Sequence, residues 1–141
     1  MELDTHLLQT AAALGGMLTK KGRKLATAES CTGGWVAKCC TDIAGSSAWF
    51  DMSVVSYSNQ AKMRMLHVQE KTLAEHGAVS GQTVCEMATG VLDCSDADIA
   101  VAISGIAGPG GGTDDKPVGT VWFAWCIRGL AAEAEQALFD G

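Results

Sequence analysis

The sequence predicts an α/β fold, and two patterns carry that prediction. Apolar residues recur every three or four positions from Leu3 to Leu18, which is typical of an amphipathic helix. Short continuous apolar runs, such as 98–103 (DIAVAI), are typical of strands that are buried on both faces of a sheet. The chain has 141 residues, which is enough for one hydrophobic core but not for two. We therefore expect a single domain.

In the first half of the chain, each predicted element has a local signal. The first helix is expected to end at the stop signal Lys20-Lys21-Gly22. A short apolar strand at 25–28 then leads through small residues into a second helix, which extends to about Ile43. The apolar run 52–55 predicts the next strand.

The second half begins with helices and ends with strands. Residues 59–66 and 70–76 are predicted to form two short helices. Ser80 begins a longer helix, whose apolar face consists of Val84, Met87, Ala88, Val91 and Leu92. The apolar run 98–103 opens into the longest glycine-rich loop, and 118–127 is predicted to be the strand that follows this loop.

Composition and charge exclude several classes of function. Nearly half of the residues are apolar (48%) and only 18% are charged, so the chain is expected to be globular. A net charge of −6, with ten scattered Lys and Arg residues, argues against a nucleic-acid partner and favours a small-molecule substrate. The sequence shows neither an apolar run of membrane-spanning length nor a signal-peptide pattern, so we expect no membrane partner and a cytoplasmic location.

The cysteines and histidines do not form a metal-binding pattern. None of the six cysteines lies in a C-x-x-C motif, and the three histidines have no ligand spacing. We therefore expect reduced, mostly buried thiols, no metal and no redox cofactor.

Two small-residue loops follow predicted strands, where open α/β sheets usually bind ligands. In the first, Ser30, Thr32, Gly33 and Gly34 precede a helix, an arrangement that either binds an anion or simply caps the helix. This loop contains neither G-x-G-x-x-G nor G-x-x-x-x-G-K-[ST]. The second loop, 104–117, is either a functional segment or a flexible surface linker. Its candidate ligand-binding residues are Ser104, Gly105 and Gly108.

The stretch 45–62 combines residues suited to acyl transfer. Ser46 and Ser47 lie at a glycine turn before the predicted strand, and Tyr57 and Lys62 follow it. A lysine that loses its proton can activate a serine hydroxyl, directly or through a tyrosine. A strand rises ~3.3 Å per residue, so the serines and Tyr57 meet only if the chain folds back. Taken singly, these side chains also fit ordinary turn, surface and helix positions.

Five motifs together resemble the CinA C-terminal domain family, which includes nicotinamide-nucleotide amidases. They are Ala28–Gly34, Gly45-Ser46-Ser47, Tyr57–Lys62, His76–Ser80 and Ile103–Pro109 together with Lys116–Gly119. The resemblance implies a single-domain three-layer α/β/α sandwich with a mostly parallel or mixed central sheet, and a homodimer or higher homo-oligomer. It also implies hydrolysis of the carboxamide of nicotinamide mononucleotide, with Ser47, Tyr57 and Lys62 as the catalytic residues.

The end of the chain departs from the family pattern. Family members continue with an F-x-G-x-R segment and a helix, whereas this sequence stops at Phe139-Asp140-Gly141. The domain is therefore expected to cover 1–141 without that helix, and the alternative function is a catalytically silent nucleotide-binding or regulatory module of the same fold.

The mechanism expected from this resemblance begins at Ser47. Its hydroxyl attacks the amide carbon, and neutral Lys62 takes the proton, directly or through Tyr57. Backbone N–H groups around Gly45 and Ser46 stabilise the oxyanion, and either loop 32–34 or loop 105–112 holds the phosphate. A cysteine hydrolase that uses Cys31 at the helix start is a further alternative.

Overall fold

The computed structural model describes residues 2–141. Its helices are α1 (Glu2–Lys21), α2 (Trp35–Thr41), α3 (Asn59–Leu66), α4 (Glu70–His76) and α5 (Gly81–Asp93), with a short 3-10 turn η1 at Ser46–Ala48. Its strands are β1 (Leu25–Glu29), β2 (Phe50–Val55), β3 (Ile99–Gly105), β4 (Thr120–Ile127) and β5 (Glu133–Leu138).

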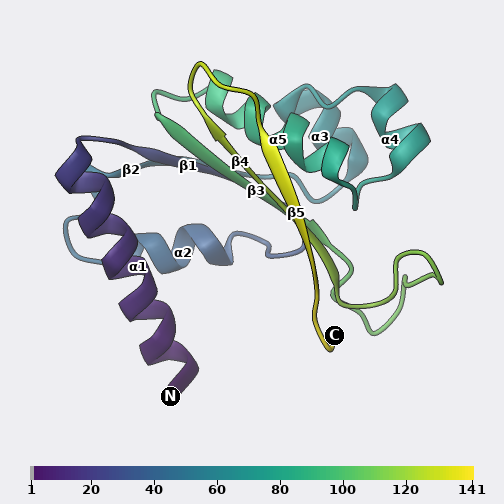
Figure 1. The fold of residues 1–141 in the computed structure, drawn as a ribbon, viewed down its shortest axis with the longest axis horizontal. Coiled ribbons are helices and arrows are strands. Elements are labelled where there is room, and N and C mark those ends of the chain that lie inside the picture. The colour runs from purple at the N-terminus through teal and green to yellow at the C-terminus, as the bar shows by residue number, and fades with distance from the viewer. Residues whose placement is uncertain (1) are drawn as a thin grey trace.

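The five strands form one mixed sheet in the order β2-β1-β3-β4-β5. β1 is parallel to both β2 and β3, whereas β4 and β5 are antiparallel to their neighbours. Figure 1 shows α1 and α2 on one face of the sheet and α3, α4 and α5 on the other. The predicted three-layer α/β/α sandwich with a mixed sheet is confirmed.

Local signals explain where several helices begin and end. Ser58 accepts a hydrogen bond from the N–H of Ala61 at the start of α3, and Ser80 does the same for Thr83 at the start of α5. Helix α1 has acidic residues in its first turn and lysines in its last turn, which suits the helix dipole. No helix among residues 2–141 combines the length and the apolar character that a membrane crossing requires.

The main core lies between the sheet and α5. Val84, Met87 and Val91 of α5 are fully buried, as the apolar periodicity predicts. The sheet presents small side chains to them, namely Ala26, Ala28, Ala100, Ala102 and Ala124. Gly90 of α5 lies against the end of α3, where a Cβ atom would overlap the carbonyl oxygen of Leu66. This glycine therefore sets how closely the two helices approach each other.

Two features differ from the expectations drawn from the sequence. The strand β5 was not predicted, because its sequence EAEQAL is rich in residues that favour helices. It forms because β4 offers a free edge, with which it pairs from Thr120↔Leu138 to Trp125↔Glu133. All six cysteines are free, but the expectation that most are buried was wrong, since only Cys40 and Cys126 are.

Candidate active site

The parallel register of β1, β2 and β3 brings three serines to the same edge of the sheet. Glu29 at the end of β1 pairs with Val55 of β2 and with Ile103 of β3. The next residues, Ser30, Ser56 and Ser104, therefore reach this edge at one level, and all three are buried. The loops that leave these strands surround the candidate site.

Lys62 reaches this edge from the first turn of α3. Its side chain is 1% exposed, and its Nζ lies 2.9 Å from Ser30 Oγ. The same Nζ donates hydrogen bonds to the carbonyl oxygens of Ser56 at 2.9 Å and Tyr57 at 3.1 Å. A charged Lys62 donates to Ser30 Oγ as well, whereas a neutral amine that donates its two N–H groups to the carbonyls would accept the Ser30 hydroxyl with its lone pair.

Burial changes the protonation of Lys62. Desolvation lowers the pKa of its ammonium group below the ordinary value of 10.5, and the nearby Cys31 acts in the opposite direction with a smaller effect. No carboxylate forms an ion pair with Lys62 among the described residues. Burial therefore shifts the equilibrium towards the neutral amine, which is the form that a general base requires.

The structure does not bring Ser47 to Lys62. Ser47 lies in η1, before β2, whereas Tyr57 and Lys62 lie beyond the other end of that strand. The N–H of Leu25, at the start of β1, donates to the carbonyl of Trp49, which places this segment at the opposite edge of the sheet. Six strand residues span roughly 20 Å. The expected grouping of Ser47, Gly45 and Ser46 with the site is corrected for this reason, and Ser30 occupies the position beside Lys62.

Tyr57 contacts Lys62 through its backbone carbonyl and not through its side chain. Its carbonyl oxygen holds Lys62, while its side chain is 75% exposed and borders the site. No hydrogen bond of its phenol to Ser30 or Lys62 is found among residues 2–141. The phenol is therefore placed to meet a ligand rather than to relay a proton between these two groups.

A cavity of about 300 Å³ opens in front of Ser30 and Lys62, near the lower end of the size range of ligand pockets. The glycine-rich loop between β3 and β4 forms much of its wall; this loop extends from the sheet near the C-terminus in Figure 1. The cavity is lined by Ser30, Cys31, Tyr57, Lys62, Ala78, Val79, Ser104, Gly105, Ile106, Ala107, Gly108, Gly110 and Gly111. Of the predicted binding residues, Ser30, Ser104, Gly105 and Gly108 line it, whereas Thr32, Gly33 and Gly34 do not.

A larger cavity of about 380 Å³ lies elsewhere, at Leu66, Glu86 and Asp93. Neither Ser30 nor Lys62 lines it. The smaller cavity is the candidate site, because it contains both the hydroxyl and the amine that acyl transfer needs.

Glu29 is a residue of this region that the sequence analysis did not single out. It is fully buried, and its carboxylate accepts hydrogen bonds from the N–H groups of Val36 and Ala37 in the first turn of α2. The Thr32 hydroxyl donates to the same carboxylate at 2.7 Å. These donors, which made loop 32–34 a candidate phosphate site, are thus already bonded within the protein.

Among the described residues, two N–H groups in the turn after Ser30 have no oxygen acceptor, although both act on the Cys31 sulfur. Within residues 2–141, the N–H groups of Cys31 and Thr32 donate to no oxygen atom, whereas that of Gly33 bonds to the Ser30 carbonyl. Both lie directly after the Ser30 hydroxyl, at the junction of a strand and a helix. Nucleophilic serines at such junctions use the N–H of the following residue to stabilise an oxyanion.

The Cys31 side chain lines the cavity but is poorly suited to nucleophilic attack. Burial raises the pKa of its thiol, although its own N–H, Lys62 and the N–H of Thr32 act in the opposite direction. The thiol form therefore predominates. The described residues contain no cluster of three or more His, Cys, Asp and Glu side chains that could hold a metal ion.

Comparison with known proteins gives consistent matches along the chain. The family model for the CinA C-terminal domain matches residues 7–141. The nicotinamide-nucleotide amidohydrolase PncC of Escherichia coli K12 is 60% identical over 138 residues, which are 98% of this chain and 84% of that protein. A CinA-like protein of Chloroherpeton thalassium is 53% identical over 135 residues, which are 96% of this chain and 29% of that protein.

Solved structures match the fold as well. The competence damage-inducible protein A of Klebsiella pneumoniae subsp. pneumoniae MGH 78578 has a TM-score of 0.92 at 45% identity, over 96% of this chain and 83% of that one. The competence/damage-inducible protein CihA of Agrobacterium tumefaciens has a TM-score of 0.89 at 46% identity, over 92% of this chain and 79% of that one.

Proposed function

This chain belongs to the CinA C-terminal domain family, and we propose that it is a nicotinamide-nucleotide amidase. The reaction is hydrolysis of the carboxamide of nicotinamide mononucleotide to nicotinic acid mononucleotide and ammonia. The relative named nicotinamide-nucleotide amidohydrolase supports the substrate. The observation that carries the chemistry is the 2.9 Å contact between Lys62 Nζ and Ser30 Oγ at the wall of the cavity.

We propose Ser30, in place of Ser47, as the nucleophile. Its oxygen attacks the carboxamide carbon while neutral Lys62 takes the hydroxyl proton. The N–H groups of Cys31 and Thr32 stabilise the oxyanion that forms. Lys62 then gives the proton to the amide nitrogen, the C–N bond breaks and ammonia leaves. Water hydrolyses the resulting ester of Ser30, with Lys62 again taking a proton and returning it to the serine oxygen.

The glycine-rich loop is the proposed site for the phosphate. Gly105, Gly108, Gly110 and Gly111 line the cavity, and backbone N–H groups of glycines can approach a phosphate closely. Loop 32–34 is less suitable, since Glu29 already binds the first turn of α2 and the Thr32 hydroxyl. The predicted homo-oligomer and the predicted cytoplasmic location stay predictions.

The test is ammonia release from nicotinamide mononucleotide by the purified chain, with Ser30→Ala as the control. A thermal-shift measurement with the same compound reports binding separately. Release that depends on Ser30 supports the amidase. Binding without release supports the alternative, a catalytically silent nucleotide-binding module.

A further inference from the structure

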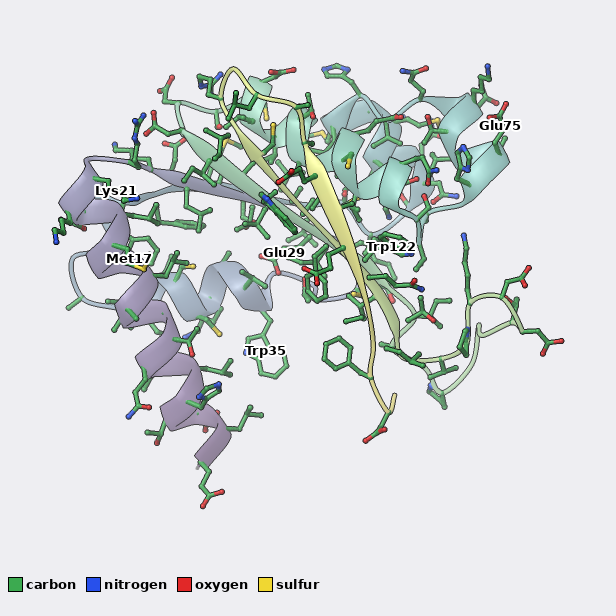
Figure 2. All side chains as sticks on the ribbon, viewed as in Figure 1. Met17, Lys21, Glu29, Trp35, Glu75 and Trp122 are labelled. Atoms are coloured by element: carbon green, nitrogen blue, oxygen red, sulfur yellow. The ribbon has the colours of Figure 1, made fainter. Side chains whose placement is uncertain are left out.

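The carboxylate of Glu29 connects three parts of the chain beneath the site. Glu29 is the last residue of β1 and is 0% exposed. Its two carboxylate oxygens accept hydrogen bonds from the N–H groups of Val36 at 3.0 Å and Ala37 at 2.9 Å. Figure 2 shows Glu29 between the sheet and the start of α2. Burial of a charged carboxylate is unfavourable unless hydrogen bonds replace its water. Here backbone and hydroxyl donors take the place of that water.

Hydroxyl groups complete the environment of this carboxylate. Thr32 in the turn donates to Oε1 at 2.7 Å, and Ser53 of β2 donates to Oε2 at 3.3 Å. Ser53 in turn accepts a hydrogen bond from Thr27 at 2.6 Å. The carboxylate is therefore attached to β2, to the turn and to α2.

Helix α2 has no side-chain cap of its own. Its N-cap residue is Gly34, with φ of 101°, and the preceding Gly33 has φ of 60°. Two successive glycines make the turn after Ser30 intrinsically flexible. Glu29 supplies the missing cap from the strand and, through Thr32, holds the middle of the turn. These bonds restrict the backbone that carries Ser30.

We propose that Glu29 is a positioning residue for Ser30. Its carboxylate fixes the turn 30–34 so that Ser30 Oγ stays beside Lys62 Nζ and the backbone N–H groups that follow Ser30 keep their positions. Glu29 does not line the cavity and makes no hydrogen bond with Lys62, so it acts through the turn and not on the reacting atoms. This inference rests on the proposed function only in taking Ser30 as the nucleophile.

The test measures how fast a fluorophosphonate probe labels Ser30, which requires no knowledge of the substrate. The probe forms a bond from phosphorus to Ser30 Oγ and releases fluoride. Glu29→Gln replaces one oxygen by an NH₂ group, so the N–H of Val36 or Ala37 then faces a donor. Because small displacements in a site reduce rates strongly, we expect labelling to slow by about 10- to 100-fold.

A matched control exists in the same chain. Glu86 accepts the N–H of Gln69 at 2.8 Å and the Thr72 hydroxyl at 2.6 Å, and it caps the start of α4 away from the cavity. Glu86→Gln removes a comparable cap, so it should lower the melting temperature without slowing the labelling of Ser30. Equal slowing in both variants would show a general structural effect and would overturn the proposal.

A second pair of variants covers the case in which Glu29→Gln fails to fold. Thr32→Val removes the hydroxyl that attaches the turn to Glu29 and keeps the side-chain shape, so labelling should slow several-fold. Thr72→Val removes the corresponding hydroxyl at Glu86 and should leave the labelling rate unchanged.

The pH dependence of labelling separates positioning from an electrostatic effect on the base. In Glu29→Gln the rate should fall at every pH, with the midpoint of the profile nearly unchanged, because burial is the main cause of the lowered pKa of Lys62 and the variant leaves that burial in place. A shifted midpoint, or labelling at the native rate in folded Glu29→Gln, would overturn the proposal.

Absence of labelling in the native chain would reject both Ser30 as the nucleophile and the positioning role of Glu29. Labelling of Ser30 without ammonia release would reject only the proposed substrate.

Discussion

Lys62 Nζ lies 2.9 Å from Ser30 Oγ, although the two residues are 32 positions apart in the chain. The contact joins the turn after β1 to the first turn of α3. It is buried, and two carbonyl oxygens fix the amine on its other sides. The serine and the lysine are the pair that we propose as nucleophile and base, and each role can be tested separately.

The choice between the two candidate serines can be tested by two substitutions. Ser30→Ala removes the hydroxyl beside Lys62, and we expect kcat for ammonia release to fall by roughly a thousandfold or more. Ser47→Ala removes an exposed hydroxyl at the opposite edge of the sheet and should leave kcat within about twofold. Circular dichroism checks that both variants fold. The reverse outcome would restore Ser47 as the nucleophile.

The protonation of Lys62 predicts a rising pH–rate profile. Because desolvation lowers the pKa of Lys62 below 10.5, the fraction of neutral amine grows as the pH rises through the lowered value. We expect kcat/KM to rise over that window and then to level off. Lys62→Arg cannot lose its proton at accessible pH and should be nearly as inactive as Lys62→Ala. A folded Lys62→Arg variant with most of its activity would mean that the residue acts as a fixed charge.

Substitution of Cys31 tests the cysteine alternative. Cys31→Ala keeps the backbone N–H that we assign to the oxyanion and removes only a thiol whose pKa is raised by burial. We expect kcat to stay within a few-fold of the native value in the ammonia assay. Complete loss of turnover in a variant with a native melting temperature would favour a cysteine nucleophile instead.

The role of the glycine-rich loop predicts a charge-specific effect at Gly110. This residue lines the cavity, and a Cβ atom there would meet nothing within 4 Å. Gly110→Asp should therefore fold, and its negative charge should raise KM for the phosphate-bearing substrate by about tenfold at low salt. Gly110→Asn has the same shape without the charge and serves as the control. Equal KM values for the two variants would place the phosphate elsewhere.

The packing of α5 on α3 predicts a stability effect at Gly90. A Cβ atom there would overlap the carbonyl oxygen of Leu66, so Gly90→Ala should lower the free energy of unfolding by about 1–3 kcal/mol or more. Gly16 in α1 has nothing within 4 Å of such an atom, and Gly16→Ala should raise the same quantity by roughly 0.5–1 kcal/mol. Urea denaturation followed by circular dichroism measures both. An unchanged midpoint for Gly90→Ala would mean that the helices can move apart freely.

Local patterns in the sequence predicted most of the elements. The helices at 59–66 and 70–76 have the predicted bounds, because Ser58 caps the first and Gly77 follows the second. β5 was missed, since its alternating Glu and Ala residues pair with β4 only after the rest of the sheet exists. Pairing between strands depends on the tertiary context more than helix formation does.

The sequence by itself determined the fold class and the two loops at the edge of the sheet, and it predicted Lys62 and Ser30, which line the cavity, as catalytic and substrate-binding residues respectively. It did not determine which serine faces Lys62. The answer depends on the parallel register of β1 with β2 and β3, which places Ser30 beside Ser56 and Ser104 and leaves Ser47 at the other edge. Nor did it identify Glu29, whose hydrogen-bond partners lie between two and 24 residues away along the chain. Such contacts form only when distant segments pack together, so only the tertiary structure decided them.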